Sequence, residues 1–211
     1  MSIPLGLTHK EHVILKRLST PQKIQDFLDK FPINHEKKGG TCNSVRVALR
    51  EGKAHCIEGA FIAAAALWLH GERPLLLDFQ TLPIDEDHVV TVYKQNGYWG
   101  AISKTNHAVL RFRDPIYRTI HELALSYFHE YFMTKSGKKT LRRYSRPFSL
   151  KPFGTEWITS EEGMWDIAQA LDESPHFPLV PKKQEKFLRA SSKIEREACY
   201  LIEWKESNPR T

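Results

Sequence analysis

The stretch that decides the fold is residues 51–71, which read EGKAHCIEGAFIAAAALWLHG. From Cys56 to Leu69 apolar side chains occupy all sides of a helix instead of one stripe, which predicts a helix buried on most of its surface. Gly71 then ends this helix. Its most apolar window, 59–69, is much shorter than the roughly 20 residues that cross a bilayer. We therefore expect a core helix and no membrane span.

Downstream of this helix the residue pattern becomes typical of strands. A leucine-rich run is followed by a run of Val, Thr and Tyr, which are strand formers. Asn96-Gly97 then supplies the two residues with positive φ that a type I′ hairpin turn requires. The expected strands cover residues 74–79, 88–94 and 98–105, with a further one at 109–112. They predict an antiparallel sheet built around the hairpin.

Capping residues place the remaining elements. Asp114-Pro115 is an N-cap followed by a first-turn proline, and Thr159 with Glu162 forms a capping-box pattern. The expected helices cover residues 21–31 after Thr20, then 45–49, 114–132, 159–171 and the amphipathic 182–205.

These elements predict one α+β domain over residues 1–175, in which an antiparallel sheet packs against the buried helix that Cys56 begins. Residues 176–211 are expected to contribute a linker, within 175–181, and a C-terminal helix packed on the same domain. The length of 211 residues permits a full core without disulfides or a structural metal.

The three cysteines also restrict the class of protein. Cys42, Cys56 and Cys199 include no Cys-x-x-Cys pair, and an odd number cannot all pair within one chain. A zinc site built from Cys42, Cys56 and His88 would lack a close ligand pair. Residues 1–18 mix charges with apolar residues, unlike an export signal. We expect a soluble cytoplasmic protein in a reducing compartment, with no metal and no cofactor.

The net charge of +6 is concentrated in one place. Residues 135–151 contain seven Lys or Arg residues, Arg142 and Arg143 among them, and no acidic residue. Aromatic residues between these charges would suit phosphate contacts and base stacking. A nucleic-acid surface, a loop that binds an anionic ligand or shapes the substrate groove, and an ordinary solvated loop all remain open.

Cys56 is the candidate nucleophile. A helix N-terminus presents free N–H groups and about half a positive charge, which lowers a thiol pKa and can hold the oxyanion of an attacked carbonyl. The ordinary alternative is a small core residue, because free cysteine is among the most buried residue types. Cys42 and Cys199 are expected to be packing residues of this kind.

His88, at the start of a predicted strand, is the candidate proton carrier. If Asn96-Gly97 is a two-residue turn, His88 faces Thr105 across the hairpin and has Ser103 as its diagonal neighbour on the same face. Either hydroxyl could then orient the imidazole. Asp85-Glu86-Asp87, a solvated loop by default, could raise the pKa of His88 or bind a cationic group.

Residues 51–105 resemble the core of the transglutaminase-like superfamily of papain-type cysteine enzymes. The resemblance rests on Gly52-x-x-x-Cys56-x-x-x-Ala60, on DHVVTVY at 87–93 and on GYWGAIS at 97–103. It implies that the helix-start cysteine is the nucleophile, that the strand histidine is the base, and that an aspartate after Trp-x-x-apolar orients the histidine. Cys56 and His88 match this pattern.

The third position departs from the family pattern, because it holds Ser103. A serine can accept a hydrogen bond from an imidazole N–H but cannot balance an imidazolium with negative charge. Thr105, a water molecule, or Asn106, by analogy with the asparagine of papain-type sites, could substitute. Weaker candidates for substrate binding are Asn43, Trp99, Thr105, Asn106, Arg142 and Arg143.

The leading expectation is cysteine-dependent acyl chemistry on a peptide or protein amide through a Cys56 thioester. Hydrolysis makes a peptidase or amidase, and transfer to an amine is compatible with the same residues. The alternative is a transglutaminase-like binding module without full catalytic machinery, which would hold a peptide, an anionic ligand or nucleic acid through the cleft or through residues 135–151.

Overall fold

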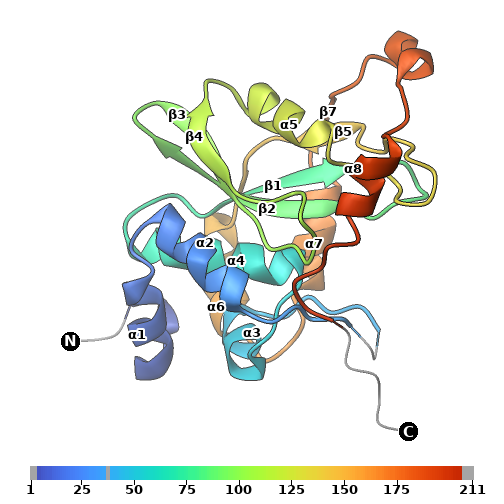
Figure 1. Cartoon of the computed structure of the whole chain (residues 1–211). Coiled ribbons are helices and arrows are strands. Elements are labelled where there is room, and N and C mark those ends of the chain that lie inside the picture. The colour runs from blue at the N-terminus through green and yellow to red at the C-terminus, as the bar shows by residue number, and fades with distance from the viewer. Residues whose placement is uncertain (1–3, 37–38, 206–211) are drawn as a thin grey trace, which may run out of the picture.

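A computed structural model describes residues 4–36 and 39–205 and shows an α+β fold in which a seven-stranded antiparallel sheet packs against helices (Figure 1). The strands are β1 (Leu75–Gln80), β2 (His88–Gln95), β3 (Tyr98–Ile102), β4 (Arg113–Tyr117), β5 (Arg143–Ser145), β6 (Phe148–Ser149) and β7 (His176–Pro178). Their order is β4-β3-β2-β1-β5-β7, and β6 pairs with β1 beside β5. The expected fold class is confirmed at this level.

Helices cover both faces of the sheet (Figure 1). The α-helices are α1 (His9–Arg17), α2 (Pro21–Lys30), α3 (Val45–Glu51), α4 (Cys56–Leu69), α5 (Ile120–Phe128), α6 (Glu156–Thr159), α7 (Trp165–Asp172) and α8 (Lys193–Ala198). The described residues also form three short 3₁₀ helices, η1 (Pro4–Gly6), η2 (Lys151–Phe153) and η3 (Lys182–Phe187). The two faces bury separate cores, one with α4 and its neighbours and the other with α5.

The central helix α4 has the predicted bounds, Cys56–Leu69. Every residue from Ile57 to Leu67 is buried, which accounts for the absence of a polar stripe. Gly59 lets the chain after β3 cross α4 closely, because a Cβ at this position would lie 2.4 Å from the Cβ of Lys104. The packing of α4 therefore fixes the path of the segment that follows β3.

The hairpin turn also forms as predicted. Asn96 and Gly97 have φ of 49° and 89°, and Gln95 pairs with Tyr98. The predicted register therefore holds from the turn to the pair of Thr91 and Ile102, but the predicted pairing of His88 with Thr105 does not form. The pairing stops at Ile102, so the expected strand over 98–105 is three residues too long. Ser103 and the residues after it leave the sheet.

The prediction for residues 109–132 was wrong in two respects. The strand lies at Arg113–Tyr117 instead of 109–112, so Asp114-Pro115 does not open a helix. Strand β4 is an edge strand, where the missing N–H of a proline is tolerated. Helix α5 begins later, where the Thr119 hydroxyl accepts from the backbone N–H of Glu122, and it ends at Phe128.

The helix expected over 159–171 is divided. Thr159 ends α6, and α7 begins at Trp165. Long-range hydrogen bonds hold the connection between them: the Ser44 hydroxyl donates to the carbonyl of Ser160, and the N–H of Met164 donates to the carbonyl of Cys42. These tertiary contacts outweigh the local capping pattern.

The C-terminal expectation was also wrong. The supposed linker contains β7, which pairs with β5 and so belongs to the sheet. In place of one helix over 182–205, the chain forms η3 and the short α8. Between them the N–H of Ser191 donates to the carbonyl of Gly137, a contact that interrupts helical hydrogen bonding.

Across residues 4–36 and 39–205, none of the helices combines the length and apolar character that a bilayer span requires. Met1 to Ile3, the first residues of the segment 1–18 that is unlike an export signal, lie outside the described residues. Thr8 caps α1 a few residues later with a complete capping box.

Candidate active site

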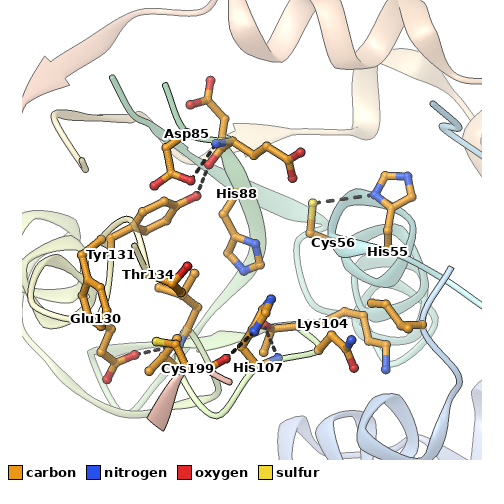
Figure 2. A pocket seen from close by; sticks show the side chains of 18 of the residues that line it. His55, Cys56, Asp85, His88, Lys104, His107, Glu130, Tyr131, Thr134 and Cys199 are labelled. Carbon is orange, nitrogen blue, oxygen red and sulfur yellow. Dashed lines mark hydrogen bonds between the residues drawn. The ribbon is translucent and has the colours of Figure 1, made fainter. Parts of the chain in front are cut away.

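A cavity of about 600 Å³ lies where the start of α4 meets the start of β2 (Figure 2). Its walls come from six parts of the chain: the segment before α3, the start of α4, the segment that leads into β2, the segment after β3, the segment after α5, and Cys199 at the end of α8. The residues with reactive or polar side chains that line it include His55, Cys56, Asp85, His88, Lys104, Thr105, Asn106, His107, Glu130, Tyr131 and Cys199. The cavity thus brings together Cys56 and His88, which the sequence had singled out.

Cys56 occupies the first position of α4 and is partly exposed to this cavity. Figure 2 shows its sulfur between the imidazole of His55 on one side and that of His88 on the other. Burial by itself would raise the pKa of the Cys56 thiol, but interactions with His55, and next with His88, outweigh it and lower the pKa to about 6. Much of the sulfur is therefore thiolate at neutral pH.

His88 is held by a chain of two hydrogen bonds. Its Nε2 lies 2.9 Å from the hydroxyl oxygen of Ser103, and that hydroxyl lies 2.6 Å from the carbonyl oxygen of Leu110. The Leu110 carbonyl can only accept, so the single hydroxyl proton of Ser103 is donated to it, and Ser103 accepts the Nε2–H of His88. In the neutral ring, Nδ1 of His88 is therefore the nitrogen with a free lone pair.

His55 was missed by the sequence analysis. Its Nδ1 lies 3.7 Å from Sγ of Cys56, and its Nε2 lies 2.7 Å from the carbonyl oxygen of Thr41. Carboxylate oxygens of Glu36 and Glu58 lie 3.5 and 3.6 Å from the same Nε2. Burial alone would lower the pKa of His55, but the thiol and these carboxylates raise it to about 9.

Glu58 is a fully buried carboxylate one turn into α4. It accepts from the backbone N–H groups of His55 and Asn43, from the hydroxyl of Thr41, and from the amide of Asn34. Four donors suit the ionised form, which only accepts hydrogen bonds. The sequence carried a signal for this residue, because Glu58 follows His55 by three positions, the spacing of a capping box.

Two of the weaker sequence candidates line the cavity, Thr105 and Asn106. Asn106 does not orient His88, because its side chain donates to the carbonyl of Trp204 and accepts from the N–H of the same residue. Thr105 accepts from the N–H of His107 through its hydroxyl. Among the proposed partners of His88, only Ser103 makes the expected contact.

The other weak candidates lie away from the residues that line this cavity. Asn43 hydrogen-bonds Glu58 through its backbone, and Trp99 lies in the hairpin with the Lys94 ammonium 5.3 Å from its ring centroid. Arg142 donates to the carbonyls at positions 139 and 141, and Arg143 donates to the carbonyl at position 176. Both guanidinium groups thus bind the chain itself.

The remaining cysteines differ from Cys56. Cys42 is buried, donates to the carbonyl of Met164, and has a pKa raised to about 12, mainly by burial. Cys199 is buried in the wall of the cavity, and burial raises its pKa as well. Within the described part of the chain, the group of side chains spaced to hold a metal ion is Asp78, Asp87 and Asp172, which does not include Cys56.

No protein-family model and no curated protein matches this chain.

Proposed function

We propose that the protein is a cysteine-dependent acyl-transfer enzyme of the transglutaminase-like type, with Cys56 as nucleophile and His88 as proton carrier. The observation that carries the proposal is the position of the Cys56 thiol: it begins a buried helix, has a pKa lowered to about 6, and opens into a cavity that His88 also lines. A buried cysteine that served only for packing would have a raised pKa, as Cys42 does.

The site supports a two-step reaction on a peptide or protein amide. In the first step the thiolate attacks the carbonyl carbon, and the oxyanion is held by the free N–H groups in the first turn of α4. As the C–N bond breaks, His88 supplies the proton that the leaving amine needs, and Cys56 retains the acyl group as a thioester. Water then attacks the thioester, His88 takes its proton, and the thiolate is released.

The assignment to the transglutaminase-like type is supported by the order of the elements. A helix-start cysteine precedes an antiparallel sheet, a histidine opens the second strand, and its hydrogen-bond partner follows the third. The partner is Ser103 and not a carboxylate. This difference favours one second candidate, a binding module of the same type that holds a peptide in the cavity without cleaving it. Either function suits a reducing compartment, because all three cysteines are free.

An activated ester separates the two candidates without knowledge of the substrate. The protein is mixed with p-nitrophenyl acetate at pH 7, and intact mass and peptide mapping follow acetylation. The enzyme proposal predicts a burst of one nitrophenolate per chain, a transient acetyl group on Cys56, and its loss by hydrolysis. The matched variant Cys56→Ser is expected to lose the burst, and Cys42→Ser to keep it.

Acetylation of Cys56 no faster than that of a free thiol, or a stable acetyl group, would favour the binding module. Repeating the reaction with an added primary amine identifies the acceptor. Faster loss of the acetyl group together with formation of the N-acetyl amine indicates transfer, and an unchanged rate indicates hydrolysis.

A further inference from the structure

The two histidines beside Cys56 have different partners. His88 is buried, and its ring nitrogen Nε2 is bonded to an uncharged hydroxyl, that of Ser103. Of the three acidic residues that precede His88, Asp87 accepts from the N–H and hydroxyl of Thr81, and Asp85 accepts from the hydroxyl of Thr140. Within the described residues, the side-chain partner of the His88 ring is Ser103, and Glu86 makes no hydrogen bond to that ring. An imidazolium at His88 would thus lack a hydrogen-bonded carboxylate.

His55 has the partners that His88 lacks. Its Nε2 donates to the carbonyl of Thr41 at 2.7 Å, which leaves Nδ1 directed at the Cys56 sulfur 3.7 Å away. Two carboxylates, those of Glu36 and Glu58, lie within 3.6 Å of Nε2. Negative charge is therefore available on the far side of the ring when Nδ1 takes a proton.

We infer that the two histidines divide the work at Cys56: His55 holds the positive charge that keeps the sulfur as thiolate, the buried carboxylate of Glu58 balances that charge, and His88 exchanges protons with substrate and water. The inference rests on the proposed function and adds His55 to its machinery, with Glu58 as a positioning residue. At rest the proton that leaves Sγ is held on Nδ1 of His55. During acylation it passes through solvent in the cavity to His88 and on to the leaving amine, and the proton that His88 takes from water in the second step returns to His55 by the same route.

The other ionisable groups near the thiol support this division. Cys42 and Tyr131 both interact electrostatically with Cys56, but burial raises the pKa of each well above neutral, so both are uncharged at pH 7. Lys104 lines the same cavity, but its ammonium donates to the carbonyls of Leu28 and Phe31. The pair formed by Cys56 and His55 has pKa values of about 6 and about 9, so thiolate and imidazolium coexist between these pH values.

The test is a pH titration of the thiolate absorbance at 240 nm in the full chain, with the spectrum of Cys56→Ser subtracted. The titration uses wild type, His55→Gln, Glu58→Gln and His88→Gln, and the exposed His9→Gln in α1 serves as matched control.

The inference predicts a wild-type midpoint near 6. Replacing His55 should move it to about 8 or above, toward the free-thiol value. Glu58→Gln should move it in the same direction, His88→Gln should move it by less than His55→Gln does, and His9→Gln should leave it nearly unchanged.

A larger shift in His88→Gln than in His55→Gln would overturn the inference. If the His55 or Glu58 variants do not fold, as judged by circular dichroism, the wild type and Cys56→Ser suffice: the Cε1–H NMR resonance of His55 should titrate at lower pH once the thiolate is absent, and an unchanged midpoint would contradict the inference. The ester burst tests the proposed function separately. A His55-dependent thiolate without a burst would reject the enzyme and keep the ion pair.

Discussion

Nε2 of His88 and Oγ of Ser103 lie 2.9 Å apart, and the Ser103 hydroxyl donates a hydrogen bond to the carbonyl of Leu110. This relationship fixes the orientation of the ring through a neutral acceptor. It also fixes the direction of every hydrogen bond in the chain, because the carbonyl at its end can only accept. A residue at position 103 must therefore both accept from the histidine and donate to the carbonyl.

Replacing Ser103 tests this requirement. Ser103→Ala should lower the rate of Cys56 acetylation by about 3- to 10-fold, because a neutral hydrogen bond contributes about 1 kcal/mol. Ser103→Asp should not raise the rate above wild type, because an ionised carboxylate cannot donate to the Leu110 carbonyl and would face it as a second acceptor. The burst rate with p-nitrophenyl acetate measures both variants. A gain of activity in Ser103→Asp would contradict the direction of the hydrogen-bond chain.

The three cysteines should react very differently with iodoacetamide. The pKa of Cys56 is lowered to about 6, so its alkylation rate should rise as the pH increases through 6 and then level off. Cys42 is buried with a pKa raised to about 12, and should remain unmodified at pH 7. Peptide mapping by mass spectrometry after a short pulse measures each site. Equal labelling of Cys42 and Cys56 in the folded protein would contradict both the lowered pKa of Cys56 and the burial of Cys42.

Gly59 should tolerate no side chain. An added Cβ would lie 2.4 Å from the Cβ of Lys104, so Gly59→Ala must push the chain after β3 away from α4. Overpacking of this kind costs about 1 to 3 kcal/mol, or a fall of several degrees in melting temperature. Because Ser103 precedes Lys104, the burst rate should fall as well. The control is Gly40→Ala, whose Cβ would meet the nearest atom, in the Trp165 ring, at 3.4 Å, and which should leave both quantities nearly unchanged.

The ion pair between Glu11 and Arg46 should stabilise the protein by joining α1 to α3. Both carboxylate oxygens of Glu11 bind the guanidinium, at 2.8 and 3.2 Å, and Arg46 also donates to the carbonyl of Thr159. Burial alone would raise the pKa of Glu11, but the hydrogen bond from Arg46 and those from Thr8 lower it below 4.5. Glu11→Gln should therefore lower the free energy of unfolding at pH 7 by about 1 to 3 kcal/mol.

The pH dependence of this difference has a defined sign. A carboxyl group whose pKa is lowered by folding stabilises the protein above its unfolded pKa of 4.5, and this stabilisation is lost as the pH falls through the lowered value. The difference between wild type and Glu11→Gln in urea unfolding should thus be constant above about pH 5.5 and shrink below 4.5. The exposed pair of Arg50 and Glu51 provides the control, because Glu51→Gln should have little effect at any pH.

Local patterns accounted for the elements that carry Cys56 and His88. The bounds of α4 followed from an unbroken apolar run, and the hairpin register followed from a two-residue turn. Ser103 lies one residue beyond the last pair of that register, and it contacts His88 as predicted. Such features depend on residues that lie within about twenty positions of one another, where helix periodicity and turn chemistry operate.

Local patterns failed where distant residues compete for the same backbone groups. Asp114-Pro115 has the form of a helix start, but the chain there pairs with β3 at the edge of the sheet. The helix pattern over 182–205 is interrupted where Ser191 bonds Gly137. In each case a hydrogen bond from another part of the chain replaces the one that the local sequence favoured.

The sequence by itself determined a buried helix that begins at Cys56, a strand that begins at His88, and a hydroxyl on the same face as that histidine. Only the tertiary structure decided the surroundings of His55, because its orientation depends on the Thr41 carbonyl and on Glu36, which reach it from a segment before α3. The physical reason is that periodicity fixes which side of an element a residue occupies, whereas the charge state of a thiol depends on every group within a few ångströms, whatever its position in the chain.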